Sequence, residues 1–215
     1  MKKRYLILSL FILLALVLTS CTGGKDTIKI GSKEFTEQYI LGNMYELLLE
    51  DAGYTVEYQP MGGTSELHQA LINDEIDIYP EYTGTGLLTI LEASYDPSMS
   101  ANDVYNTVSE EYLAQFDLVW GEQTKFNNTY CLTMPKDTAS EMGIESLSDL
   151  SSKAGDLIFG TTQEFTERPD GLPGLQETYG GFQFGEVVAL DPGLLYAGIS
   201  EGDIDVTTCF GTDGQ

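Results

Sequence analysis

Arg168 is the only arginine beyond the first four residues, and it lies in the proline- and glycine-containing segment 164–171. A guanidinium offers a planar fork of N–H donors that fits a carboxylate. Loops of this composition often carry binding groups. Glu164, Glu167 and Asp170 are close along the chain, so an exposed ion pair of small energetic value is the alternative. The segment therefore indicates either a carboxylate-binding arginine or an internal ion pair.

Aromatic residues supply a second candidate chemistry. The chain has 13 tyrosines and one tryptophan. Tyr82 follows a predicted strand, Tyr130 begins another, and Phe210 lies just past a later strand end. Strand ends of open α/β sheets face the crevice where ligands bind, and aromatic faces there attract cations, quaternary ammonium groups above all. Each ring taken alone would be expected to pack in the core.

Groups for metal binding or nucleophilic catalysis are scarce. The chain has one histidine, His68, and three cysteines whose spacing fits no zinc site. A Ser-His-Asp triad would need His68, which falls in the first turns of a helix that we predict Thr64 to cap. We therefore expect no catalytic residue, no metal and no cofactor. Whether Cys131 and Cys209 are paired or free is left open.

The chain is strongly acidic, with a formal net charge of −24. Such a surface repels phosphate backbones, so nucleic acid is not an expected partner. We interpret the acidity as a solvated surface. Beyond the first twenty residues, no apolar run approaches membrane-spanning length.

The amino-terminal region predicts export. A basic start, Lys2 to Arg4, precedes an apolar run from Tyr5 to Leu18, as in secretory signals. The run is short for a membrane span, which needs about 20 residues, although a single membrane anchor is the alternative. Leu18-Thr19-Ser20-Cys21 resembles the lipobox of bacterial lipoproteins, in which the cysteine is acylated. We expect a signal peptide over 1–20, a lipid on Cys21, a tether over 21–26, and a location on the extracytoplasmic face of the cell membrane.

Short strands and amphipathic helices alternate after Lys25. The predicted strands cover 28–30, 56–58, 76–79, 130–134, 157–160, 186–189 and 204–208. The predicted helices cover 36–52, 101–115 and 194–200, with further helices beginning near 64, 146 and 173. Ile40, Met44, Leu47 and Leu48 share one face of the first helix. This alternation indicates α/β layers with largely parallel sheets.

Two lobes are expected, with the boundary near residues 123–128. We place lobe 1 at 27–125 and lobe 2 at 126–215. Segments 73–78 and 201–206 both end a helix and enter a strand through an acidic turn. Two lobes of similar construction would produce such a pair.

Six segments in sequence order carry a family resemblance: 30–38, 62–65, 77–85, 127–130, 168–171 and 211–214. Together they resemble the substrate-binding proteins of osmoprotectant ABC importers, which bind glycine betaine, choline, carnitine and related compounds. The likeness covers Thr27 to Gln215. It implies a two-lobed α/β fold of the type II periplasmic-binding-protein kind, with two crossing segments and closure over the ligand.

The resemblance implies ligand-binding roles for seven residues: Lys33, Gln38, Tyr82, Thr85, Tyr130, Arg168 and Phe210. Tyr82 and Tyr130 match members of an aromatic cage around the quaternary ammonium. Lys33, Thr85 and Arg168 match groups that hold a betaine carboxylate, and Gln38 comes from a motif that reaches the cleft. Phe210 stands where relatives often have a cage tyrosine, so the hydroxyl is lost while the π face remains.

The implied function is capture of a small quaternary ammonium osmoprotectant and its delivery to an ABC permease and ATPase, without enzymatic activity. Relatives continue past the position of Gln215 and return to lobe 1, so we expect the return segment to be missing from this chain. Two alternatives remain from the residues alone. One is a lipid-anchored extracytoplasmic hydrolase that uses paired carboxylates, and the other is a lipid-anchored structural or adhesion module.

Overall fold

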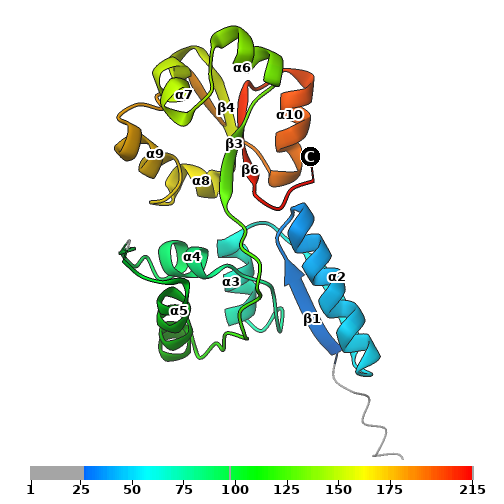
Figure 1. Ribbon diagram of the computed structural model, residues 1–215. Helices are drawn as coiled ribbons and strands as arrows, with labels where there is room; N and C mark the ends of the chain where they lie inside the picture. Colours follow the sequence, from blue (N-terminus) through cyan, green and yellow to red (C-terminus); the bar gives the residue numbers. More distant parts are fainter. Residues whose placement is uncertain (1–26, 97, 215) are drawn as a thin grey trace, which may run out of the picture.

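The computed structural model describes residues 27–96 and 98–214 and shows two α/β lobes, one above the other in Figure 1. The elements of the lower lobe are β1 (Thr27–Ser32), α2 (Thr36–Asp51), β2 (Thr55–Pro60), α3 (Thr64–Ile72), α4 (Thr83–Thr85), η1 (Gly86–Ile90) and α5 (Ala101–Phe116). The first helices and strands of the upper lobe are β3 (Tyr130–Thr133), α6 (Lys136–Met142), α7 (Leu147–Lys153), η2 (Ala154–Asp156), β4 (Ile158–Thr161) and α8 (Gln163–Glu167). The upper lobe continues with α9 (Leu172–Tyr179), β5 (Glu186–Ala189), η3 (Pro192–Leu194), α10 (Leu195–Glu201) and β6 (Val206–Phe210). An extended segment joins α5 to β3 and passes from one lobe to the other (Figure 1).

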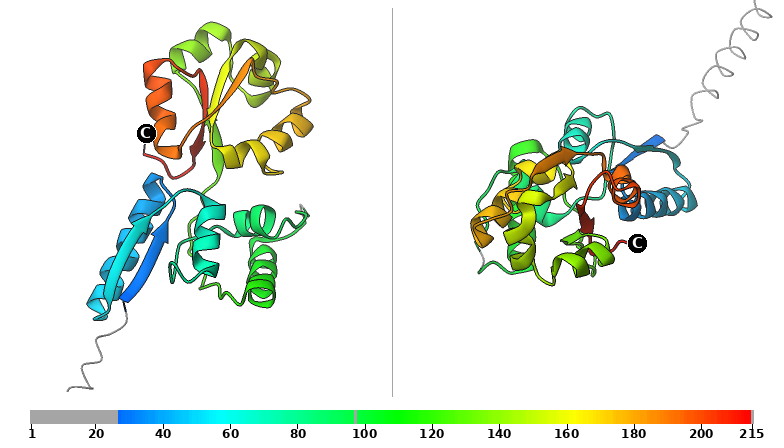
Figure 2. Two further views of the ribbon diagram at one scale, coloured as in Figure 1. Left: turned by 180° about the vertical axis from the view of Figure 1, so that it is seen from behind. Right: turned by 90° about the horizontal axis from the view of Figure 1, so that it is seen from above.

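The upper lobe is built on a four-stranded sheet in the order β3-β6-β4-β5. β4 runs parallel to β5 and β6, whereas β3 runs antiparallel to β6. Helices lie on both faces of this sheet (Figures 1 and 2). Phe159 and Val206 are fully buried in its core, together with Phe165 and Phe182. The predicted α/β architecture with largely parallel strands is therefore confirmed, with one antiparallel edge.

The lower lobe has a parallel pair, β1 and β2, against which α2 packs (Figure 2). The strand predicted over 76–79 is wrong, because the structure has only a single bridge there, between Ile30 and Ile78. Hydrogen bonds do join Lys29 and Gly31 of β1 to this segment. Pro80 has no N–H to continue a ladder, which explains why the pairing stops.

The acidic turn that recurs in the sequence has the same structural role in both lobes. The Asp77 carboxylate accepts a hydrogen bond from the Lys29 backbone N–H at 2.7 Å, and the Asp77 N–H donates to the Lys29 carbonyl at 2.8 Å. Asp205 forms the matching pair with Ile158, at 2.8 Å and 2.9 Å. In each lobe the aspartate therefore binds the backbone of the neighbouring strand through a matching pair of hydrogen bonds, as a common construction would require.

Helix starts agree with prediction at one site and differ at another. The Ser146 hydroxyl accepts from the Asp149 N–H and begins α7 as predicted. Thr64 does not cap α3, because Gly63 holds that position and Thr64 is the first helical residue. The Thr64 hydroxyl is buried without a hydrogen-bond partner in the part of the chain that the structure describes. The N-cap of α3 is therefore Gly63, one residue earlier than predicted.

The apolar face of α2 lies in solvent. Ile40, Met44, Leu47 and Leu48 are between 50% and 65% exposed. The buried positions of this helix are instead Gln38 and Gly42, and a Cβ atom at Gly42 would collide with the Tyr58 ring. Periodicity identified the helix and its apolar face, but it did not reveal which side of the helix packs.

His68 is a core residue. Its ring forms T-shaped pairs with Tyr112 and Phe116, with centroid distances of 5.4 Å and 4.7 Å. Burial lowers the pKa of His68. No carboxylate or hydroxyl of the described residues hydrogen-bonds to its Nδ1 atom, so the chain's single histidine has no triad partner there.

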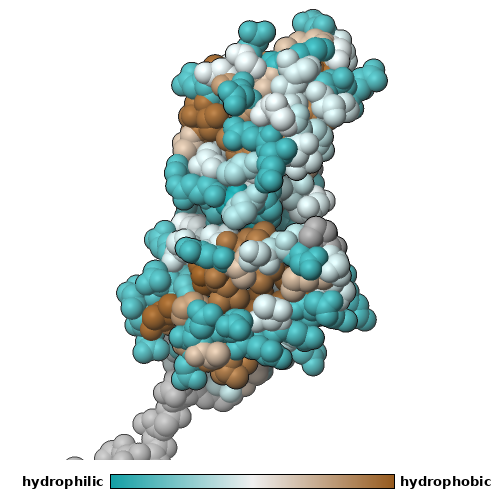
Figure 3. Space-filling view, turned by 90° about the vertical axis from the view of Figure 1, so that its left-hand side faces the viewer, coloured by the Kyte–Doolittle hydropathy of each residue, from teal (hydrophilic) through white to brown (hydrophobic). Residues whose placement is uncertain are grey.

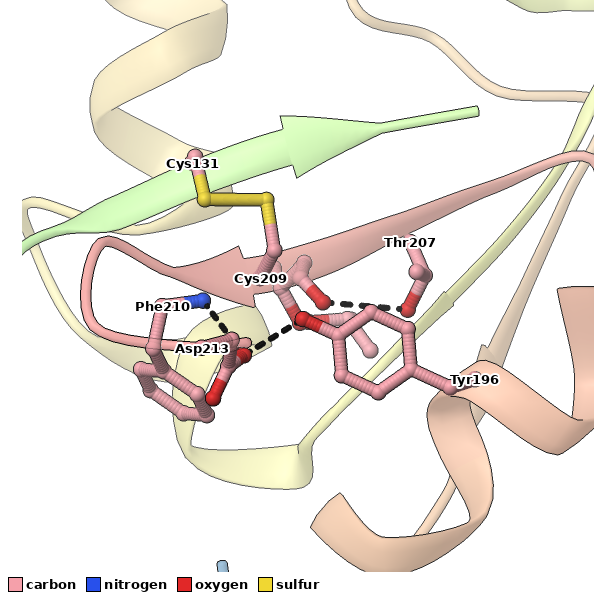
Figure 4. Close-up of a disulfide and its surroundings, with 8 residues drawn as sticks. Cys131, Tyr196, Thr207, Cys209, Phe210 and Asp213 are labelled. Atoms are coloured by element: carbon pink, nitrogen blue, oxygen red, sulfur yellow. Dashed lines mark hydrogen bonds between the residues drawn. A yellow bond between two sulfur atoms is a disulfide. The ribbon is translucent and has the colours of Figure 1, made fainter. Parts of the chain in front are cut away.

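A disulfide joins Cys131 of β3 to Cys209 of β6 (Figure 4), which answers a question that the sequence left open. The two cysteines are cross-strand partners with Cα atoms 4.8 Å apart. The adjacent partners in the same register are Tyr130 and Phe210. The crosslink therefore lies beside two of the predicted ligand-binding rings.

Replacing both cysteines, Cys131→Ala with Cys209→Ala, is expected to lower the free energy of unfolding by about 2–4 kcal/mol, since the bond closes a long loop in the unfolded chain. Denaturant titration without reductant measures the change. The unaltered protein should lose the same stability when a reductant is added, whereas the double variant should not respond to it. An equal unfolding midpoint for the two oxidised proteins would contradict the expectation.

Candidate ligand-binding site

A cleft of about 1310 Å³ lies between the lobes. Its lining includes all seven residues proposed from the sequence: Lys33, Gln38, Tyr82, Thr85, Tyr130, Arg168 and Phe210. They come from the ends of β1, β3 and β6, from the start of α2, from the segment around α4, and from the loop after α8. Residues as far apart in the sequence as Lys33 and Phe210 thus line one cleft. On the face shown in Figure 3, apolar surface gathers on the lower lobe just below its junction with the upper lobe.

Aromatic rings form a continuous series across the cleft. Tyr82 and Phe35 of the lower lobe have ring centroids 6.3 Å apart. Phe35 stacks on Phe210 of the upper lobe at 4.5 Å, with an angle of 14° between the ring planes. Phe210 then lies 5.2 Å from Tyr130, which lies 4.9 Å from Phe165. Within this series, the stacked rings of Phe35 and Phe210 connect the two lobes.

The Tyr82 hydroxyl is held by a polar network. It accepts from the Gln38 side-chain amide at 3.1 Å and donates to the Glu37 carboxylate at 2.5 Å. Asn128, in the segment between the lobes, donates to the same Glu37 oxygen at 3.1 Å. Burial, with the nearby Glu37 as a smaller contribution, raises the pKa of Tyr82 far above its usual value. Gln38 therefore positions an aromatic ring, and the phenol stays protonated.

Lys33 forms a buried ion pair with Glu81. The Lys33 Nζ lies 2.6 Å from a Glu81 carboxylate oxygen, and the two side chains are only 7% and 5% exposed. The Glu81 carboxylate also accepts from the Tyr82 backbone N–H at 2.8 Å. The Lys33 ammonium lies 5.2 Å from the Tyr82 ring centroid, within cation–π range. One candidate carboxylate-binding cation is thus matched by a carboxylate of the chain itself.

Arg168 is 5% exposed and is surrounded by acceptors. Its guanidinium donates to Asp170 through two nitrogens at 2.5 Å and 3.0 Å, and to Glu164 at 2.9 Å. It also donates to the Thr85 hydroxyl of the lower lobe at 3.2 Å and to the Tyr130 hydroxyl at 3.4 Å. The predicted internal pairing with Glu164 and Asp170 is therefore present, although Arg168 itself is buried while the Asp170 side chain is 44% exposed.

Several residues of the site were not singled out by sequence reasoning. Phe35 and Glu37 lie inside segment 30–38, and Glu81 lies inside segment 77–85. Asn128 lies inside segment 127–130. The family-like segments were the available signal for all four. Nothing in the sequence indicated that Phe35 would stack on Phe210 from the other lobe.

Residues 27–96 and 98–214 contain no group of three or more His, Cys, Asp or Glu side chains placed to hold a metal ion. Within the same described ranges, no helix is both long and apolar enough to cross a membrane. The proposed signal peptide, the tether and Cys21 lie outside the described residues.

The two α/β lobes with a cleft between them define the periplasmic-binding-protein class of fold. A solved structure titled glycine betaine/carnitine/choline ABC transporter is similar to this chain, with 28% sequence identity and a TM-score of 0.55, and the match covers 88% of this chain and 70% of that one. Apo YehZ of Escherichia coli is also similar, with 30% identity and a TM-score of 0.51, and the match covers 88% of this chain and 71% of that one. The family model described as the substrate-binding domain of the ABC-type glycine betaine transport system matches residues 26–215. The chain belongs to this family.

Three curated relatives illustrate the range of the family. A glycine-betaine-binding protein of Pseudomonas aeruginosa is 34% identical over 200 residues, covering 88% of this chain. The carnitine transport binding protein OpuCC of Listeria monocytogenes is 33% identical and covers 100% of this chain and 73% of its own length. An ergothioneine transport permease/binding protein of Helicobacter pylori is 35% identical over 188 residues, covering 86% of this chain. This chain spans 63% of the Pseudomonas protein and 33% of the Helicobacter protein.

Lys33→Met is expected to lower the free energy of unfolding by about 3–5 kcal/mol, because Glu81 would remain as an uncompensated buried charge. The double variant Lys33→Met with Glu81→Gln should be more stable than the single variant, since no unpaired charge remains. Denaturant titrations of the four members of this cycle measure the coupling. As a control, Lys136→Met at an exposed position should change stability by no more than about 0.5 kcal/mol. A double variant no more stable than Lys33→Met would contradict a charge-based explanation.

Proposed function

We propose that this protein is an extracytoplasmic solute-binding protein that captures a small quaternary ammonium compound in the cleft. The series of aromatic rings across the cleft is the observation that carries the proposal. An ammonium group with no N–H donors is recognised through π faces and not through hydrogen bonds. Tyr82, Tyr130 and Phe210 are the proposed cage residues, and Phe35 is added to them because it stacks on Phe210.

The two-lobed arrangement supports capture by closure. Phe35 and Tyr82 belong to the lower lobe, whereas Tyr130 and Phe210 belong to the upper one. A ligand held by rings from both lobes stabilises their approach, as in hinge closure around ligands. The roles of Lys33, Thr85 and Arg168 toward a ligand carboxylate remain predictions from the resemblance.

The proposed partners are an ABC permease and its ATPase, to which the loaded protein delivers its ligand. The curated relatives, named as transport binding proteins, support this assignment. A lipid on Cys21 is the proposed attachment to the cell membrane. The comparisons lend no support to the hydrolase alternative, since these relatives are named for transport and binding.

Titration calorimetry against glycine betaine, choline, carnitine and proline betaine tests the proposed function. At least one compound should bind, and Tyr82→Leu or Tyr130→Leu should each weaken that binding about 3- to 30-fold, because a cation–π contact contributes about 0.5–2 kcal/mol. Tyr95→Leu, on an exposed loop, is the matched control and should leave the affinity unchanged. No heat with any of the four compounds, from a folded protein, would refute the proposal.

Cys21→Ser is expected to move the protein from the membrane fraction to the soluble fraction, because the acyl chains are its only proposed anchor. Fractionation of cells expressing each form, at low and high salt, measures this. A serine replacement at Cys131 would not remove the lipid and serves as the control. If Cys21→Ser protein still sediments with membranes at both salt concentrations, the lipoprotein assignment is wrong.

A further inference from the structure

We propose that the disulfide between Cys131 and Cys209 is a site of thiol–disulfide exchange that controls the ligand affinity of the cleft. The co-reactant is a dithiol. Reduction of the bond releases the strand edge that carries two rings of the cleft, Tyr130 and Phe210. The inference rests on the proposed function, because its readout is binding of the same ligand. It goes beyond that function by giving the cleft a high-affinity oxidised state and a low-affinity reduced state.

The disulfide lies at the edge of the upper sheet. β3 is an edge strand, and among the described strands it pairs only with β6 (Figure 4). The ladder between them has four residue pairs, of which Cys131 with Cys209 is one. Because a two-stranded contact of this length is marginal by itself, the covalent bond supplies a large part of the restraint on β3. Breaking the bond therefore affects β3 more than β4 and β5.

The chain passes between the lobes at this same edge. The extended segment from the lower lobe enters β3 at Tyr130. Directly after β6, the Gly211 N–H donates to the Thr129 carbonyl at 2.8 Å. Phe210, the last residue of β6, stacks on Phe35 of the lower lobe at 4.5 Å. A shift of this edge therefore changes the spacing between rings that belong to different lobes.

Other contacts keep the two rings near the cleft once the bond is broken. The Asp213 carboxylate accepts from the Phe210 N–H at 3.0 Å. The Tyr130 ring lies 4.9 Å from Phe165, which belongs to the core of the upper lobe. Reduction should therefore loosen the pair of rings without unfolding the lobe. The ligand must then order both rings when it binds, which lowers the affinity without abolishing it.

The difference in exposure between the two cysteines sets the course of the exchange. Cys131 is half-buried, whereas Cys209 is only 7% exposed. A thiolate of the dithiol attacks the Cys131 Sγ atom, the S–S bond breaks, and the Cys209 thiolate leaves and takes up a proton. The second thiolate of the dithiol then attacks the reductant's own sulfur in the mixed disulfide and releases the Cys131 thiolate, which also takes up a proton. The disulfide is thus reduced to two thiols, and the dithiol is oxidised to a disulfide.

Titration calorimetry of the full chain, with and without excess dithiothreitol, tests the inference. The ligand is whichever of glycine betaine, choline, carnitine and proline betaine the oxidised protein binds most tightly. The reduced protein should bind it about 3- to 10-fold more weakly, and reoxidation should restore the affinity. Alkylation followed by peptide mass spectrometry reports the state of Cys131 and Cys209 in each sample. The double variant Cys131→Ala with Cys209→Ala is the matched control, which should bind as weakly as the reduced protein and should not respond to dithiothreitol.

Hydrogen–deuterium exchange separates local release of the edge from global unfolding. Reduction should speed exchange in β3 and β6 and leave β1 and α2 unchanged, because only the bonded pair of strands loses a restraint. Faster exchange throughout the chain would contradict a local effect and overturn the inference.

The remaining outcomes are distinct from one another. Equal dissociation constants for the oxidised and reduced proteins overturn the inference and leave the proposed function standing. A pair that stays oxidised in the folded protein under excess dithiothreitol also overturns it, because the bond is then not an exchange site. A double variant that responds to dithiothreitol as the unaltered protein does overturns it too, since another group then causes the effect. If the oxidised protein binds none of the four compounds, the proposed function itself is wrong.

Discussion

Arg168 is almost completely removed from water, and a guanidinium in that position is stable only when acceptors surround it. Meeting this requirement brings together parts of the chain that are distant in sequence. Asp170 and Glu164 supply the charge, Tyr130 supplies a hydroxyl from β3, and Thr85 supplies one from the lower lobe. The contact with Thr85 links the lobes directly. The geometry of the cleft therefore depends on satisfying one buried cation.

The aromatic side of the cleft depends on strand pairing. Tyr130 and Phe210 are opposite each other because β3 and β6 are antiparallel in one register, and the adjacent disulfide holds that register (Figure 4). A slip of β3 by one residue would turn the Tyr130 ring to the other face of the sheet, away from Phe210. Behind them, the Asp213 carboxylate accepts from the Tyr196 hydroxyl and from the Phe210 N–H. The ring that stacks on Phe35 is thus fixed by its backbone and by a neighbouring turn.

Charged and aromatic side chains line the same cleft. Faces of aromatic rings attract cations, and the rings of Tyr82, Tyr130 and Phe210 line this cleft. Glu81 pairs with Lys33, and Glu164 and Asp170 pair with Arg168, so both cations have partners within the protein. Lys33 and Arg168 themselves lie within cation–π range of Tyr82 and Tyr130, at 5.2 Å and 5.1 Å. The protein's own cations therefore help to set the electrostatic character of the cage.

The sequence by itself determined the alternation of strands and helices, the acidic turns at Asp77 and Asp205, and the seven residues that line the cleft. These depend on local periodicity, on turn chemistry and on family-like segments, all of which are readable along the chain. Only the tertiary structure decided that 76–79 would form one bridge, that the apolar face of α2 would be exposed, that Cys131 would pair with Cys209, and that Lys33 and Arg168 would be neutralised. Each of these depends on which distant groups come into contact. Periodicity and spacing describe neighbours along the chain, so they do not show which long-range contacts are favourable.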